Sequence, residues 1–241
     1  MLTHSPSIIT NGLVLYLDAA NRRSYPGSGM TWFDLSGNGS NSTITSSPIF
    51  SQSNAGNIVF NSSYHVNTPL TTTYQNFTLF AWFTNPTSSR TARCIFSKNS
   101  FFATTINDWP VSMTINDSGT SVFLTITSGT SFFITNPSEG SSISASLGPI
   151  NSWNCVAATY NQSVLNLFIN GSLAASANNT ISLPNNTSRI WTIGNSPLPR
   201  NGGATQTQYN GNISIAKIYN RALSPTEVVQ NFNATRGRFG I

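Results

Sequence analysis

Ionisable side chains are scarce in this sequence. Only 7% of its 241 residues are charged, and it holds just two histidines, two cysteines and six acidic residues. General acid–base catalysis and metal binding both need several carboxylates, imidazoles or thiolates held close together. Because the few such groups are scattered along the chain, the composition favours a scaffold or a binding surface over a catalyst.

Two cysteines are too few for a disulfide framework. Cys94 and Cys155 each lie within a hydrophobic, strand-like run. Buried free thiols that pack as small hydrophobic side chains are the favoured interpretation, and a single bridge between the two residues is the alternative.

Long apolar runs and dense basic patches are also missing. No stretch of about 18 apolar residues occurs, and residues 1–12 lack the basic and apolar segments of a signal peptide. We therefore expect neither a membrane span nor a signal peptide. The eleven basic residues give a net charge of +5 but are spread thinly. A nucleic-acid site needs a basic stripe interleaved with aromatic residues, so we expect no nucleic-acid partner.

Hydrogen-bonding turn residues and aromatic residues are abundant. Asparagine, serine and threonine make up 95 of the 241 residues, and hydrophobic residues, including fifteen phenylalanines, make up 38%. The first group suits turns and loops, and the second is sufficient for a core. Because no repeat or linker divides the chain, we expect one domain over residues 1–241. An N-terminal arm is expected at 1–11 and a basic C-terminal tail at 233–241.

Runs of β-branched and aromatic residues recur along the chain and predict β-strands. Residues 77–83 are apolar on one side and carry Phe80 and Trp82 on the other, so both faces of this strand are expected to be covered. The runs are spaced roughly 8–15 residues apart by turn residues, which is typical of an all-β, two-sheet antiparallel sandwich. The predicted strands are residues 12–18, 57–60, 64–66, 77–83, 94–96, 111–115, 122–126, 131–135, 153–160, 164–169, 190–193 and 213–219.

Two local motifs predict hairpin connections. Asn170 and Gly171 lie between two apolar runs and predict a type I′ turn, because both residues tolerate a positive φ. Residues 116–119, Asn-Asp-Ser-Gly, predict a second and longer hairpin loop.

A third motif predicts the one helix of the chain. Ser224 and Glu227 have the spacing of a capping box, and Pro225 stands at the first helical position between them. These residues predict a short C-terminal helix of about two turns over residues 225–232.

Three segments of the sequence resemble laminin-G-like domains of the concanavalin A-like superfamily. They are residues 12–39, which open with Gly-Leu-Val-Leu-Tyr-Leu-Asp, residues 153–173, which include the Asn-Gly turn, and residues 209–240, which include the capping box. The resemblance implies two stacked, curved antiparallel sheets in a jelly roll, with the first and last strands adjacent. The ending of the chain is similar to stand-alone domains of tailed-phage and other virion structural proteins.

Some members of that superfamily are glucanases, which use two or three carboxylates on one strand. The glutamates here are Glu139, in a Ser/Gly-rich loop, and Glu227, in the capping box. Glycoside hydrolysis needs an acid and a second carboxylate that flank the scissile bond, and this pattern is missing. His4 and His65 likewise lack the context of a Ser-His-Asp triad. We therefore predict no catalytic residues and no enzymatic activity.

Some laminin-G-like domains bind calcium at a loop end, so the resemblance makes Asp18, Asp34 and Asn38 candidate oxygen ligands. The segment from Asp34 to Asn38 also fits a turn in which Asp and Asn side chains bond to nearby backbone. The turn interpretation is favoured, so no cofactor is predicted and calcium is the alternative.

Carbohydrate binding needs an aromatic surface beside amide, carboxylate or guanidinium groups, and no catalyst. Asn107, Asp108 and Trp109 form such a set in one predicted loop, and Arg200 and Asn201 lie at the tip of another. These residues are the predicted glycan-binding candidates. Trp109 also precedes a proline and a strand, so packing at the start of that strand is the alternative role for it.

These observations predict a non-enzymatic structural protein of the virion surface, either a capsid decoration or a tail- or fibre-associated protein. Its expected partners are other virion proteins and further copies of itself, with surface polysaccharide as a ligand for attachment. Arg236 and Arg238 in the basic tail are candidates for docking on an acidic partner. The alternative is a carbohydrate-binding module or adhesin of a cellular organism.

Overall fold

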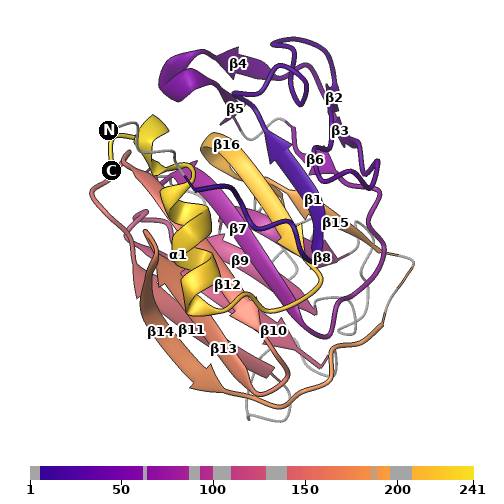
Figure 1. Ribbon diagram of the computed structural model, residues 1–241, viewed down its shortest axis with the longest axis vertical. Coiled ribbons are helices and arrows are strands. Elements are labelled where there is room, and N and C mark those ends of the chain that lie inside the picture. The colour runs from indigo at the N-terminus through magenta and orange to yellow at the C-terminus, as the bar shows by residue number, and fades with distance from the viewer. Residues whose placement is uncertain are drawn as a thin grey trace.

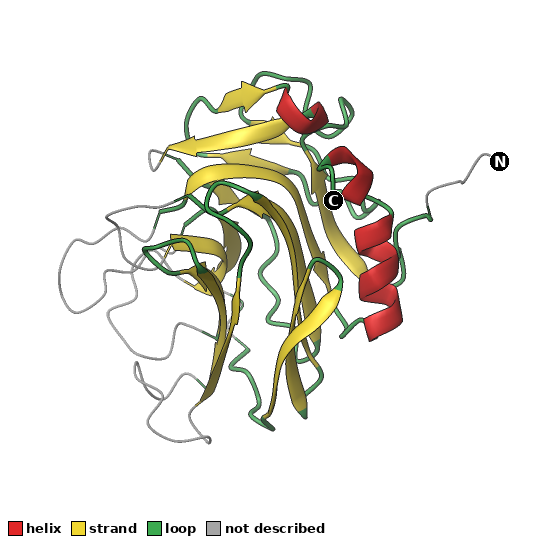
Figure 2. Ribbon diagram, turned by 90° about the vertical axis from the view of Figure 1, so that its left-hand side faces the viewer, coloured by secondary structure: helices red, strands yellow, loops and turns green. Residues whose placement is uncertain are grey.

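The computed structural model describes residues 6–61, 64–86, 93–99, 110–128, 140–185, 187, 189–195 and 208–241. These residues form two antiparallel β-sheets stacked face to face, with a single α-helix against the outer face of one sheet (Figures 1 and 2). The prediction of an all-β, two-sheet sandwich with one short C-terminal helix is therefore confirmed.

The first sheet contains both the first and the last strand of the chain. From edge to edge it consists of β14 (Ser172–Asn178), β13 (Val164–Ile169), β12 (Trp153–Tyr160), β7 (Phe77–Thr84), β16 (Asn210–Tyr219), β5 (Asn57–Asn61) and β4 (Ile49–Ser51). β1 (Leu13–Asp18) also pairs with β16, with Leu15 opposite Ile218. The adjacency of the first and last strands, which the resemblance implied, is confirmed.

The second sheet lies behind the first. From edge to edge it consists of β11 (Gly140–Ser146), β10 (Ser121–Thr127), β9 (Val111–Ile115), β8 (Arg93–Asn99), β15 (Ile190–Ile193), β6 (Val66–Asn67), β3 (Ser42–Ile44) and β2 (Thr31–Trp32). The strand predicted at residues 131–135 lies outside the described residues. β11 and β14 are each an edge strand of their sheet.

Both predicted hairpin turns are present. Asn170 has φ = 50° and Gly171 has φ = 82°, as a type I′ turn between β13 and β14 requires. Between β9 and β10, the amide of Gly119 donates to the carbonyl of Asn116 at 3.0 Å and closes the second loop.

β7 is buried on both of its faces. Phe77, Leu79 and Phe83 belong to the main core between the two sheets. Phe80 and Trp82 point the other way, into a second hydrophobic cluster on the outer face of the first sheet. The sequence predicted that both faces of this strand are buried. One face is covered by the second sheet, and the other is covered by the outer hydrophobic cluster.

The outer cluster is covered by α1 (Pro225–Asn233) and the 3-10 helix η4 (Arg236–Arg238). The capping box is formed as predicted, because the Ser224 hydroxyl accepts from the Glu227 amide and the Glu227 carboxylate accepts from the Ser224 amide at 2.8 Å. Helix residues Val228 and Phe232 are buried against the first sheet.

Both ends of the described chain pack on this outer face. The ring of Phe239 stacks on Trp82 with a centroid distance of 3.9 Å, and the Ile9 amide donates to the Asn231 side chain at 2.9 Å. The described part of the N-terminal arm, residues 6–11, and the C-terminal tail are therefore tied to the helix and sheet (Figure 1).

The two cysteines are buried free thiols, as the favoured interpretation predicted, and no disulfide joins Cys94 to Cys155. Burial raises the pKa of the Cys94 thiol to about 12 and raises that of Cys155 further. None of the helices in the described part of the chain combines the length and apolar character that a bilayer crossing requires.

Candidate functional site

The predicted glycan-binding residues Asn107, Asp108, Trp109, Arg200 and Asn201 all lie outside the described residues. Their role in carbohydrate recognition therefore stays a prediction.

Asp18, a predicted calcium candidate, holds the C-terminal tail in place. Its carboxylate accepts two hydrogen bonds from the Arg238 guanidinium, at 2.9 and 3.0 Å. It also accepts from the Tyr16 hydroxyl and the Ala20 amide, each at 3.0 Å. The negative charge of Asp18 is therefore balanced within the fold by a residue that is 220 positions away in the sequence.

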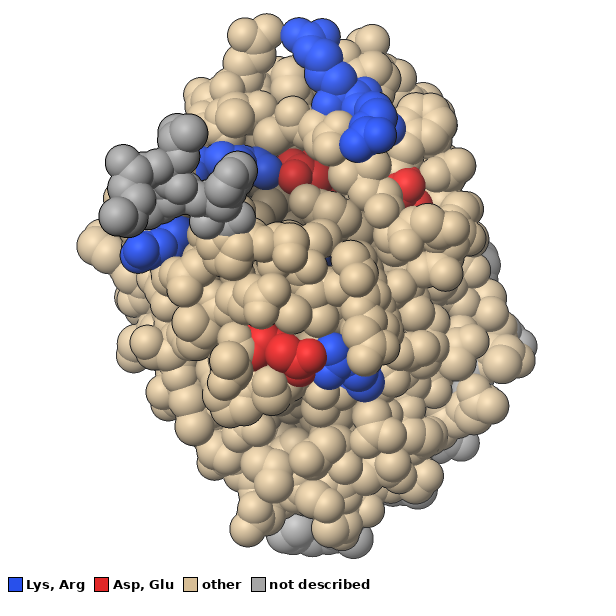
Figure 3. Space-filling view, in the orientation of Figure 1, with Lys and Arg blue, Asp and Glu red and all other residues tan. Residues whose placement is uncertain are grey.

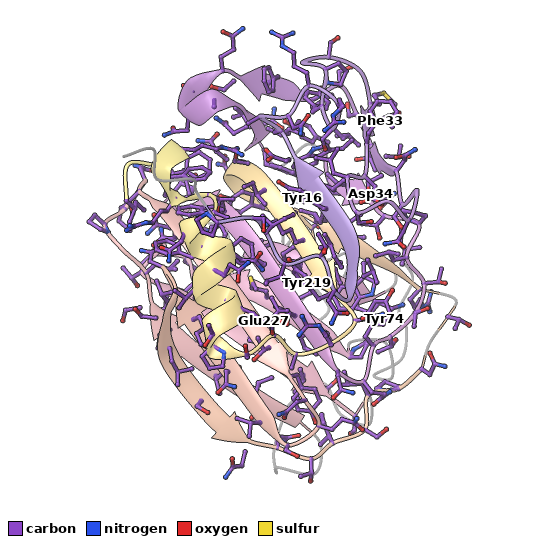
Figure 4. The ribbon with its side chains drawn as sticks, in the orientation of Figure 1. Tyr16, Phe33, Asp34, Tyr74, Tyr219 and Glu227 are labelled. Carbon is purple, nitrogen blue, oxygen red and sulfur yellow. The ribbon has the colours of Figure 1, made fainter. Side chains whose placement is uncertain are left out.

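Asp34 organises a turn beside β1 (Figure 4). Its carboxylate accepts hydrogen bonds from the amides of Tyr16, Ser36 and Ser40 at 2.9 to 3.0 Å. Asn38 completes the turn by donating to the Leu13 carbonyl at 2.9 Å. These contacts are those of the turn interpretation.

No group of three or more His, Cys, Asp or Glu side chains within the described residues has the arrangement of a metal site. Asp18 and Asp34 both bond to Tyr16, one through its hydroxyl and the other through its amide, but each carboxylate already has several donors. Calcium binding by these residues stays a prediction.

The two arginines predicted to dock on an acidic partner have different environments. Arg238 is paired with Asp18 and also donates to the Ser214 hydroxyl at 2.8 Å. Arg236 is exposed, with its guanidinium 5.8 Å from the centroid of the Phe232 ring. Docking on an acidic partner stays a prediction, and Arg236 is the residue whose charge is accessible for it.

A pocket of about 510 Å³ opens beside β4. Figure 1 shows β4 at one end of the sandwich. One wall is the loop between β1 and β2, and the other is β4 with the following 3-10 helix η1 (Ser53–Ala55). The lining includes the aromatic side chains of Tyr25 and Phe50, the polar side chains of Arg22, Ser28 and Gln52, and the backbone of Gly27.

The aromatic wall of this pocket is fixed by local hydrogen bonds. Tyr25 is buried, and its hydroxyl donates to the Gly29 carbonyl at 2.9 Å. The ring of Phe50 lies 5.5 Å from that of Tyr25 at an angle of 47°. Gly27 has φ = 103°, a conformation that favours glycine, so this residue lets the loop turn over the Phe50 ring.

The loop that carries the pocket is itself well anchored. The Asn21 carbonyl accepts from the amides of Ser24 and Tyr25, both at 2.8 Å. The Ser24 hydroxyl accepts from the Asp18 amide and donates to the Phe33 carbonyl at 2.6 Å, which joins both ends of the loop. The pocket is therefore preformed, because these hydrogen bonds fix the loop backbone from which its exposed polar side chains project.

The sequence-based candidates did not include these pocket residues. Arg22 was noticeable as part of an Arg-Arg pair next to a Tyr-Pro-Gly turn. No local sequence pattern, however, indicates that this turn lies beside Phe50. Phe50 is on β4 and lines the pocket only because of tertiary packing.

A family model described as "Concanavalin A-like lectin/glucanases superfamily" matches residues 60–229. The chain belongs to this superfamily. The match spans strands of both sheets and most of α1, in agreement with the sandwich described above. No curated protein matches the chain in sequence.

Solved structures of toxin binding domains have a similar fold. The receptor-binding domain of botulinum neurotoxin type G superposes with a TM-score of 0.66 at 19% identity, covering 92% of this chain and 51% of that chain. A structure of botulinum neurotoxin type C, whose title describes interaction with two ganglioside molecules, gives 0.68 at 16% identity, covering 94% and 52%. The ligand-binding domain of serotype D in complex with N-acetylneuraminic acid gives 0.67 at 15% identity, covering 93% and 51%.

This superfamily member spans about half the length of those toxin domains. At such low identity the likeness establishes the fold and not a shared ligand.

Proposed function

We propose that this chain is a non-enzymatic, lectin-like domain that binds carbohydrate and works on the surface of a virion. The observation that carries the carbohydrate-binding part is the preformed pocket between the β1–β2 loop and β4. Its volume of about 510 Å³ lies within the range of small-molecule sites.

The lining of the pocket suits a sugar. Phe50 is half-buried and offers aromatic surface for the apolar face of a pyranose ring, and the buried Tyr25 packs against Phe50 and supports it. Arg22, Gln52 and Ser28 are exposed around it and can exchange hydrogen bonds with hydroxyl groups. Polar groups placed beside an aromatic side chain can fix the orientation of a saccharide in such a site.

The acidic residues support a binding role rather than hydrolysis. No carboxylate from the described part of the chain lines the pocket. Elsewhere, the Arg221 guanidinium pairs with Glu227 and lowers the pKa of that carboxyl to about 2, which removes it as a general acid at neutral pH. Asp18 is bound to Arg238 and Asp34 to three backbone amides, so both carboxylates are occupied by contacts within the fold and do not form the flanking pair that glycoside hydrolysis needs.

The comparison structures give limited further support. Two of them name carbohydrate ligands, gangliosides and N-acetylneuraminic acid, for domains that contain this fold. Those ligands are bound by proteins about twice as long, so they indicate a compatible use of the fold and not a shared site.

The virion context rests on the resemblance of the chain's ending to tailed-phage structural domains and on its composition, which is poor in charge and rich in hydrogen-bonding residues. In this setting the domain would decorate a capsid or belong to a tail or fibre. It would contact other virion proteins and further copies of itself, and the pocket would serve attachment to host polysaccharide.

A glycan array with the purified chain tests the carbohydrate part. We expect binding to a defined set of saccharides, and at least about tenfold weaker binding by Phe50→Ala, which removes part of the aromatic wall. Ile49→Ala is the matched control, because Ile49 is 51% exposed on the same strand and does not line the pocket. Equal binding by both variants, or release of sugars from a polysaccharide panel, would contradict the proposal.

Mass spectrometry of purified particles from the source tests the virion part. We expect the chain at a fixed stoichiometry relative to the major capsid or tail protein. Its absence from particles, combined with glycan binding by the purified chain, would favour a cellular carbohydrate-binding module or adhesin instead.

A further inference from the structure

We infer that the pocket selects an anionic saccharide, and that the Arg22 guanidinium binds the carboxylate of that sugar. This inference rests on the proposed carbohydrate-binding function and specifies its ligand class.

The pocket has a single sign of charge. Among the described residues, Arg22 is the one ionisable group at its exposed rim, and no aspartate or glutamate belongs to the lining. Within the described ranges, Arg22 has no ion-pair or side-chain hydrogen-bond partner. In the space-filling view, basic side chains gather at the end of the molecule that carries β4 (Figure 3).

The acidic residue nearest in sequence does not cancel this charge. Asp18 directly precedes the lining residues Ala19 and Ala20, but it is only 5% exposed. Both of its oxygens accept from Arg238. The pair is neutral as a unit, so the charge of Arg22 faces the pocket uncompensated and favours an anionic ligand.

The chemistry of the neighbouring groups favours a carboxylated sugar over a simple anion. A guanidinium presents a planar fork of donors that matches the two oxygens of a carboxylate. Phe50 lies on the wall of the same pocket, supported by the buried Tyr25, and can cover the apolar face of a sugar ring. Gln52 and Ser28 supply further polar atoms for hydroxyl groups. Terminal N-acetylneuraminic acid and uronic acid units share the required carboxylate-and-ring chemistry.

The test compares a carboxylated saccharide with its neutral methyl ester. Oligogalacturonate and an N-acetylneuraminic-acid-terminated oligosaccharide are each titrated as the free acid and as the ester by isothermal calorimetry. We expect one of the free acids to bind at least about tenfold more tightly than its ester, because a hydrogen bond to a charged group is stronger than one to a neutral group. The identity of the tighter acid separates the two sugar sources.

Two variants locate the effect. Arg22→Gln is expected to bind the free acid about as weakly as the ester. Arg23→Gln is the matched control, because Arg23 is an exposed neighbour with the same charge that does not line the pocket. Arg23→Gln is expected to keep the preference for the acid. Thermal unfolding of both variants checks that the exposed loop substitutions leave the fold intact.

The outcomes separate this inference from the proposed function. Equal binding of acid and ester, with binding lost in Phe50→Ala, would overturn the inference and leave carbohydrate binding intact. An equal loss in Arg22→Gln and Arg23→Gln would mean attraction by general positive charge, and would also overturn it. Failure of the native chain to bind any saccharide, neutral or acidic, would overturn the proposed function and the inference together.

Discussion

Replacing the buried Lys217 by methionine should stabilise the protein at neutral pH. Lys217 lies on β16 in the outer cluster and is fully buried. Its ammonium nitrogen has no hydrogen-bond partner among the described residues and lies 4.8 Å from the centroids of both the Tyr16 and Phe80 rings. Burial is the main cause that lowers its pKa from 10.5 to about 8, with Arg238 acting in the same direction and Cys155 and Asp18 in the opposite one.

The pKa shift gives the size of the expected effect. A shift of this size corresponds to a cost of about 3 kcal/mol for holding the charged form in the folded state. The two aromatic rings recover about 1–2 kcal/mol through cation–π attraction, which methionine lacks. Because methionine is apolar and similarly long, we expect Lys217→Met to raise the free energy of unfolding by about 1–2 kcal/mol at pH 6.5.

The effect should depend on pH in a defined direction. Below pH 8 the lysine is protonated in both states, so its cost is constant. Between pH 8 and 10.5 the unfolded chain binds more protons than the folded one, so the stability of the native protein rises with pH relative to the variant. The advantage of Lys217→Met should therefore shrink by about 1 kcal/mol between pH 6.5 and pH 9.

Urea unfolding followed by tryptophan fluorescence at several pH values measures this difference. The buried cysteines and tyrosines titrate in both proteins, so their contributions largely cancel when the two curves are subtracted. Lys98→Met is the matched control: the pKa of Lys98 is also lowered to about 8, but its ammonium donates to the Arg189 carbonyl. Removing that hydrogen bond should make Lys98→Met less favourable than Lys217→Met. A destabilised Lys217→Met at pH 6.5, or a difference that does not change with pH, would refute the reasoning.

Three further outcomes follow from the packing and the caps. Ser224→Ala removes the N-cap that bonds the Glu227 amide and should lower the free energy of unfolding by about 1 kcal/mol in urea titration; an unchanged midpoint would contradict the role of the cap. Phe239→Ala removes the ring stacked 3.9 Å from Trp82 and should cost about 3 kcal/mol and shift the tryptophan emission to longer wavelength; no shift would mean that the tail does not cover this side chain. Cys94 and Cys155 are fully buried with raised pKa values, so Ellman's reagent at pH 8 should react with neither in the native protein and with both in urea.

The parts of the structure that the sequence predicted are those encoded over a few neighbouring residues. The Asn170–Gly171 turn depends on the φ preferences of two adjacent residues, and the Ser224 capping box on a spacing of three. Strand positions followed from local runs of aromatic and β-branched residues, so β9, β12 and β13 have the predicted bounds.

The candidate site was not predictable in this way. Its walls come from Tyr25, in the loop after β1, and Phe50, on β4, and they meet only because the loop is tied back to β1 by Ser24 and Asp18. The predicted glycan candidates were chosen because aromatic and polar residues are adjacent there in the sequence. The pocket instead brings together residues that are distant in the sequence and close in space.

By itself, the amino-acid sequence determined that this chain is an all-β sandwich with one capped helix and no concentration of catalytic groups. Only the tertiary structure decided which charges are free. Arg22 and Arg238 are the same residue type near the two ends of the chain, yet Arg238 is neutralised by Asp18 while Arg22 stands open at a pocket. The physical reason is that local propensity acts over a few residues, whereas the pairing of charges is fixed by strand register and long-range packing.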